Sequence, residues 1–194
     1  MANEHFIVFP DYVYTGKIEL TTRIESGIED EIRNISANHD GVAPTNYGWF
    51  TLKEVPLKNN LRKLQLVVGT YFVNAIKQHF PHMLDRNIEV VEPNIYSIKP
   101  NHVISSNVFR NRWYTGVVWL QTSDMGSGIR LENFNTKLYS DPPGSMDYTH
   151  DISPAQFKYA FWPAHLPASF TPNRSMIDTV VMHCTFTGFP NPKK

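Results

Sequence analysis

The spacing of apolar residues changes about halfway along the chain, from a helical repeat to a strand-like alternation. The first helical stripe consists of Leu20, Ile24, Ile28, Ile32 and Ile35. The second, wider stripe consists of Leu61, Leu64, Val67, Val68, Tyr71, Phe72, Ala75 and Ile76. Apolar residues three or four positions apart lie on one face of a helix, so the pattern predicts helices over Leu20–Ile35 and Asn59–Phe80.

Alternating apolar and polar residues predict short strands in the rest of the chain. The predicted strands are Phe6–Val13, Ile88–Val91, Asn94–Ile98, Trp113–Gln121, Gly128–Asn133, Phe157–Trp162 and Thr179–Phe186. Pro93 is expected to break the second from the third, and the prolines between Trp162 and Thr179 predict a shaped loop there. Asn135–His150 is rich in Asp, Pro, Gly and Ser and predicts an exposed insertion. Helices followed by many strands predict an α+β fold.

Composition excludes several classes of protein. The chain has 194 residues, 41% of them hydrophobic, which is enough for a core and typical of an ordered domain. Its formal net charge is zero, which argues against nucleic acid or an anionic membrane as a partner. Cys184, the single cysteine, lies in an apolar run and is expected to be a buried, inert thiol. The first residues contain no signal-peptide pattern, and no run is long and apolar enough to span a membrane.

The sequence lacks the common catalytic signatures. It contains no Gly-rich phosphate-binding loop and no G-x-S-x-G turn. His183 and Cys184 are adjacent on a predicted strand, where neighbouring side chains point to opposite faces, so they do not form a nucleophile–base pair.

A framework of residues in the second half of the chain is similar to one known family. Its members are Ile152, Pro154, Trp162, Pro163, Leu166, Phe170, Pro172 and Asn173, with TNYGWF at Thr45–Phe50 and Gly116 within YTGVVWL. In this frame the chain resembles the iron(II)/2-oxoglutarate dioxygenases, most closely their small phage and bacterial branch. The resemblance implies one domain over residues 1–194, a double-stranded β-helix (jelly roll) with N-terminal helices packed on its larger sheet. Residues 1–85 would form the helical part and residues 86–188 the barrel strands.

The functional positions of that family are not kept. The resemblance places the first two iron ligands near Asn107 and Phe109, the third at Ala168, and the arginine that binds 2-oxoglutarate at about Asp178. Iron in this family is held by two histidines and a carboxylate, and Phe and Ala provide no metal ligand. The resemblance therefore predicts a vestigial site without cofactors, in a non-catalytic structural or interaction protein.

Two other functions remain open on the same scaffold. An active hydroxylase that uses iron(II) and 2-oxoglutarate would need displaced ligands, for which His102, His165 and His183 are the candidates. Its co-substrate would then bind Arg174 or Arg112, with Arg110 or Arg130 as further possibilities from other strands. A metal-free jelly roll that binds a sugar or another small molecule is the third reading, and it would need an open cavity in the barrel.

The family branch is common in tailed phages, which extends the first reading. By this analogy the partners would be other proteins in a multi-subunit assembly such as a phage particle, at its neck, tail or head–tail joint. The chain would then reside in the virion or the host cytoplasm.

Overall fold

A computed structural model of the chain describes residues 4–8, 11–38, 49–51, 59–80, 86–103, 112–132 and 149–190. Within these ranges the chain forms two helices, α1 (Thr22–Asn38) and α2 (Asn59–His79). The strands are β1 (Glu4–Val8), β2 (Asp11–Lys17), β3 (Trp49–Thr51), β4 (Arg86–Ile98), β5 (Tyr114–Gln121), β6 (Ile129–Glu132), β7 (Thr149–Ile152), β8 (Lys158–Pro163), β9 (Ala168–Phe170) and β10 (Thr179–Pro190). The predicted α+β class is confirmed.

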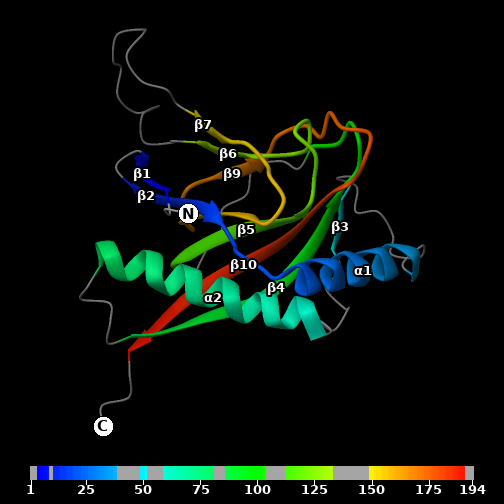
Figure 1. The fold of residues 1–194 in the computed structure, drawn as a ribbon. Helices are drawn as coiled ribbons and strands as arrows, with labels where there is room; N and C mark the ends of the chain where they lie inside the picture. The colour runs from blue at the N-terminus through cyan, green and yellow to red at the C-terminus, as the bar shows by residue number, and fades with distance from the viewer. Residues whose placement is uncertain are drawn as a thin grey trace, which may run out of the picture.

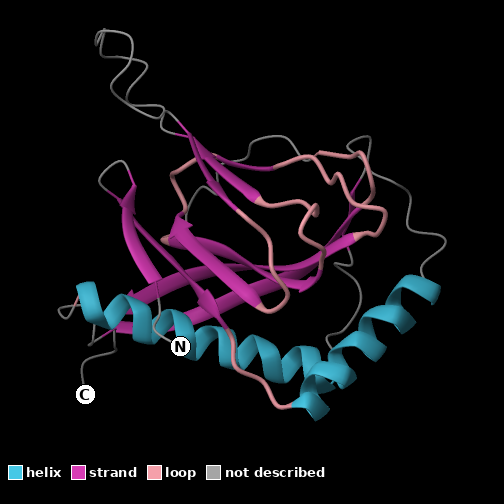
Figure 2. Cartoon of the chain, turned by 45° about the horizontal axis from the view of Figure 1, so that its top comes forward, coloured by secondary structure: helices cyan, strands magenta, loops and turns pink. Residues whose placement is uncertain are grey.

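The strands form two antiparallel sheets. Among the described residues, the larger sheet has the order β1-β2-β8-β5-β10-β4-β3 and the smaller sheet the order β7-β6-β9. Figure 1 shows α1 and α2 on one side of the larger sheet, with β6, β7 and β9 on the other. Figure 2 shows the same layers from a second direction, with the helices end to end beneath the strands.

The larger sheet contributes to two cores, one on each face. Val68, Phe72 and Ile76 of α2 share the first core with Phe161 and Phe186 of the sheet. The second core lies between the two sheets and has Trp119, Trp162, Ile129, Leu131 and Phe170 among its members. The sheet is therefore buried on both faces, which explains why β5 is buried at all but its last residue.

Most predicted elements are found close to their predicted bounds. Both helices are confirmed, as are the strands at β5, β6, β8 and β10. The region predicted as one edge strand around Pro10 forms two paired strands, β1 and β2. The predicted insertion lies outside the described residues except for its last two, which begin β7. Neither described helix has an apolar stretch long enough to cross a membrane.

Two predictions around prolines are wrong. Pro93 does not divide a strand, because β4 runs continuously through it. The register against β10 shifts at this point, from His183↔Asn94 to Thr185↔Val91, so Pro93 lies in an irregularity of the ladder where its missing N–H is tolerated.

The proline-rich segment before β10 also contains a short strand, β9, which pairs with β6. Its residues lie between Pro167 and Pro172 and keep their own N–H groups.

Candidate functional site

The candidate site is the face of β10 that points between the two sheets. Val180, Met182, Cys184 and Phe186 of this strand belong to the core beneath the helices. Val181 belongs to the core between the sheets. Because side chains alternate along a strand, His183 and Thr185 share the face of Val181 and point into the barrel.

His183 is the centre of a buried polar network in the barrel. Its Nε2 lies 2.8 Å from the Oγ1 of Thr115, which is on the neighbouring strand β5. The Thr115 hydroxyl in turn donates to the carbonyl of Cys184 at 3.2 Å. Since that hydroxyl has a single hydrogen, this arrangement has His183 donating from Nε2, and the lone pair of the neutral ring is then on Nδ1.

Burial controls the charge of this network. It lowers the pKa of His183 from 6.5 to about 4, so the imidazole is neutral at pH 7. The ring of Tyr96 from β4 lies 5.5 Å from that of His183, and burial raises the pKa of Tyr96 to about 12. This side of the barrel therefore presents neutral donors and acceptors.

The Trp162 indole is directly opposite Thr115 in the register between β8 and β5. Trp162 is 1% exposed, and its Nε1 has no hydrogen-bond partner within the described part of the chain. A buried N–H without an acceptor is costly, and such a group marks a place where a ligand or water can contribute.

The structure places the vestigial positions of the resemblance in different environments. Ala168 begins β9, where it is opposite Leu131 of β6 and belongs to the core between the sheets. It faces the barrel, and its correspondence to the third iron ligand of the family stays a prediction from the resemblance. Asn107 and Phe109 lie outside the described residues, and the sequence from 104 to 111 contains no His, Cys, Asp or Glu.

Asp178 does not lie in the barrel. Its Oδ2 accepts hydrogen bonds from Ser97 Oγ at 2.8 Å and Lys99 Nζ at 2.6 Å. Asp178 precedes β10 and lines a cleft together with Glu29 and Ile32 of α1. Thr179, the first residue of β10, shares the face of the barrel-facing Val181. The barrel-facing position here is therefore a threonine, 0% exposed, that accepts a hydrogen bond from the Ser127 amide at 2.9 Å.

The candidates for a displaced metal site are scattered. His102 and His165 are exposed, whereas His183 is buried. No group of three His, Cys, Asp or Glu side chains in the described ranges is arranged to hold a metal ion, so these three histidines do not come together.

The candidate arginines lie on the surface. Arg112 and Arg174 are exposed. Arg130 points away from the barrel and pairs with Asp151 through two contacts of 2.7 Å. Arg110 lies outside the described residues. None of the buried side chains in the described ranges is Asp, Glu, Lys or Arg.

These residues do not fit iron and 2-oxoglutarate. Iron in such a site needs two imidazoles and a carboxylate, and the buried side chains in the described ranges include one imidazole and no carboxylate. The carboxylates of 2-oxoglutarate need a cation within hydrogen-bond distance, and the buried set offers none. The arrangement can instead bind neutral groups by hydrogen bonds.

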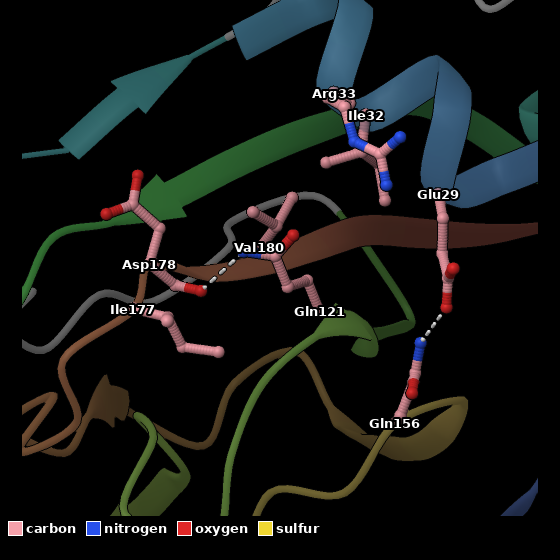
Figure 3. A pocket seen from close by; sticks show the side chains of 8 residues that line it. All are labelled: Glu29, Ile32, Arg33, Gln121, Gln156, Ile177, Asp178 and Val180. Atoms are coloured by element: carbon pink, nitrogen blue, oxygen red, sulfur yellow. Dashed lines mark hydrogen bonds between the residues drawn. The ribbon is translucent and has the colours of Figure 1, made fainter.

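A cleft of about 460 Å³ lies outside the barrel, between α1 and the ends of β5 and β10 (Figure 3). Its lining consists of Glu29, Ile32, Arg33, Gln121, Gln156, Ile177, Asp178 and Val180. Gln156 donates to Glu29 at 2.9 Å, and Gln121 donates to the carbonyl of Asp178 at 3.2 Å. The two glutamines thus connect the helix, the sheet and the loop before β10.

No family model and no curated protein sequence matches the chain. Solved structures do match its fold. A prolyl-4-hydroxylase from Pseudomonas putida superposes with a TM-score of 0.64 at 14% identity, over 90% of this chain and 91% of the other. HygX from Streptomyces hygroscopicus, with nickel, 2-oxoglutarate and hygromycin B bound, has a TM-score of 0.64 at 8% identity, over 90% and 82%.

A third match is a prolyl hydroxylase from Trichoplax adhaerens in complex with a hypoxia inducible factor peptide fragment. Its TM-score is 0.63 at 10% identity, over 90% of this chain and 83% of the other. The chain therefore has the fold of the 2-oxoglutarate/iron(II) oxygenases, and its predicted resemblance to that superfamily is confirmed. At these identities the match concerns the fold alone.

Sequence reasoning missed two features of this region. Thr115 was not singled out, although its alternation with Val117 and Trp119 places it on the barrel face. The glutamines of the outer cleft carry no sequence signal, because their meeting depends on how the sheet and α1 pack.

Proposed function

We propose that this chain is a double-stranded β-helix that does not catalyse 2-oxoglutarate-dependent oxidation and acts through contacts with other proteins. One observation carries the proposal. The buried side chains of the described strands include one neutral imidazole but no carboxylate and no cation, on a scaffold shared with enzymes that need all three. The absence of His, Cys, Asp and Glu between residues 104 and 111 supports it.

The test is anaerobic calorimetry of the metal-free protein with iron(II) or manganese(II), with and without 2-oxoglutarate. We expect no heat of binding and no conversion of 2-oxoglutarate to succinate. A prolyl hydroxylase of the same fold serves as the positive control. Stoichiometric metal binding that 2-oxoglutarate strengthens would contradict the proposal and establish the alternative, an active hydroxylase, which the shared fold favours.

A metal-free binding function is the second candidate, and the orphan Trp162 N–H favours it. A sugar or another neutral small molecule would accept from Trp162 and exchange hydrogen bonds with Thr115 and His183. Native mass spectrometry of the purified protein tests this reading, since a retained ligand would add a discrete mass that disappears on denaturation.

We propose further that the protein contacts occur in a multi-subunit assembly such as a tailed-phage particle. The family resemblance in the sequence is the support for this step. Mass spectrometry of purified particles would test it, because a structural component is present at a fixed ratio to the other particle proteins.

A further inference from the structure

Exposed apolar side chains gather on three loops that lie together at one end of the barrel. Val103 is 51% exposed, Met125 58%, Met176 94% and Ile177 45%. Among the described residues, Leu66 on α2 is the one other large apolar side chain with comparable exposure. Backbone hydrogen bonds join the three loops, from Asn173 to His102 at 3.0 Å and from Arg174 to Met125 at 2.9 Å. Apolar side chains gathered in this way mark an interaction surface.

The loop that presents Met176 is rigidly held. Asn173 is 0% exposed, and its Nδ2 donates to the carbonyls of Ile98 at 2.8 Å and Ile177 at 2.9 Å. Its Oδ1 accepts from the Ser175 amide at 3.1 Å. Asn173 is thus buried with both polar atoms of its side chain hydrogen-bonded, and it fixes a turn in which Met176 is almost fully exposed. Such preorganisation reduces the entropy that a partner must overcome on binding.

The outer cleft adjoins this loop. Ile177, the residue after Met176, is part of the cleft lining together with Ile32 and Val180 (Figure 3). Met176 itself lines neither this cleft nor a second one of about 410 Å³ to which Arg174 contributes. The exposed methionine and a recess lined by both apolar and polar side chains therefore occupy neighbouring positions on one surface.

We propose that this surface binds a second copy of the chain, with Met176 of each copy seated in the cleft of the other. A knob beside a recess is self-complementary, because a two-fold axis between two copies places the knob of each against the recess of the other. The proposal deepens the proposed function, since it names the partner of an interaction protein, and it rests on that function.

The charges of the surface agree with pairing between identical copies. Arg174 is exposed two residues before the methionine, and the cleft contains two carboxylates, Glu29 and Asp178, against one cation, Arg33. In a two-fold pair each Arg174 meets Glu29 of the other copy, so that each interface holds the contact twice. The net charge of zero means that identical chains do not repel one another as a whole.

The test is sedimentation velocity of the full chain from about 10 μM to about 1 mM, a range that covers weak association. We expect the average mass to rise with concentration for the natural chain. Met176→Glu should weaken the association at least about tenfold, because it places a charge in the apolar contact. The matched control is Leu66→Glu, which charges an exposed apolar residue away from these loops and should leave the association unchanged.

Charge reversal tests the orientation of the two copies. Arg174→Glu and Glu29→Arg should each weaken the association, and the two together in one chain should restore it. Lys77→Glu reverses an exposed charge on α2 that lines neither cleft, and it should have no effect. Melting temperatures of all variants establish that they remain folded.

A natural chain that stays monomeric at the highest concentration would overturn the proposal. Association that Met176→Glu does not weaken would overturn it as well, and so would a double charge reversal that fails to restore binding. These results are separate from the iron titration, which concerns the barrel interior and not this surface.

Discussion

His183 is neutral because it is buried, and this makes the stability of the protein depend on pH. Its pKa is about 4 in the folded chain and 6.5 in an ordinary environment. Between these values the unfolded chain binds a proton that the folded chain does not. The contribution of His183 to the free energy of unfolding is therefore complete above pH 6.5 and is lost as the pH falls toward 4. We expect a slope of up to about 1.4 kcal/mol per pH unit in this window.

Urea unfolding between pH 4 and 7.5 measures this slope. His183→Gln keeps a neutral hydrogen-bonding group and should remove the slope that His183 contributes. His102→Gln, at an exposed position, is the control and should retain it. An unchanged pH dependence in His183→Gln would show that the imidazole is not the titrating group.

Asn173 is the second residue whose role is decided by buried hydrogen bonds. Asn173→Ala leaves the carbonyls of Ile98 and Ile177 without the Nδ2 donor and should lower the free energy of unfolding by about 3 kcal/mol. Asn74→Ala, on the exposed side of α2, should cost nothing. Chemical denaturation of both variants tests the difference, and equal stability would contradict the structural role of Asn173.

At the scale of elements, the contact between β5 and β8 depends on a glycine. A Cβ added at Gly116 would lie 2.4 Å from the carbonyl oxygen of Ala160 and 2.4 Å from Phe161 Cδ1. The strand backbone cannot yield without breaking the ladder, so Gly116→Ala should destabilise the protein by more than about 2 kcal/mol.

Gly69→Ala on α2 is the matched control for this substitution. Its added Cβ would meet only Val90 Cγ2 at 3.1 Å, and alanine favours the helix. Gly69→Ala should change the free energy of unfolding by no more than about 1 kcal/mol. Thermal or urea unfolding can distinguish this change from the larger effect of Gly116→Ala. Equal effects at the two positions would indicate that the close approach of β8 is not what requires Gly116.

At the scale of the whole molecule, both cores share one sheet. Phe72 of α2 stacks on Phe186 of β10 with ring centroids 3.8 Å apart, while Trp119 of β5 lies in the core between the sheets. Because the same strands line both cores, unfolding of one core would remove the sheet against which the other core packs. We therefore expect one cooperative transition in calorimetry, with equal calorimetric and van't Hoff enthalpies.

Phe72→Ala and Trp119→Ala probe the two cores separately. Each should lower the stability by about 3–5 kcal/mol, and each should shift the transition as a whole. Two resolved transitions in either variant would mean that the helical layer and the barrel unfold independently.

Several elements follow from local patterns in the amino-acid sequence. The stripes of α1 and α2 and the alternation of β5 and β10 depend on neighbours within a few residues, so their types and approximate bounds could be predicted. The resemblance in framework residues also indicated the fold. The tertiary structure decided what depends on distant partners. Pro93 stays within β4 because the pairing of β4 with β10 shifts register beside it, and Asp178 lies outside the barrel, where Ser97 and Lys99 donate to it.

The site follows the same division. Ala168 lies in the core between the sheets, whereas its assignment to a ligand position rests on the resemblance and stays a prediction. The Thr115–His183 bond joins residues 68 positions apart, and the surface around Met176 is assembled from three separate loops. Periodicity in a sequence fixes which side of its own element a residue occupies, whereas only the packing of the elements fixes which residue it meets there.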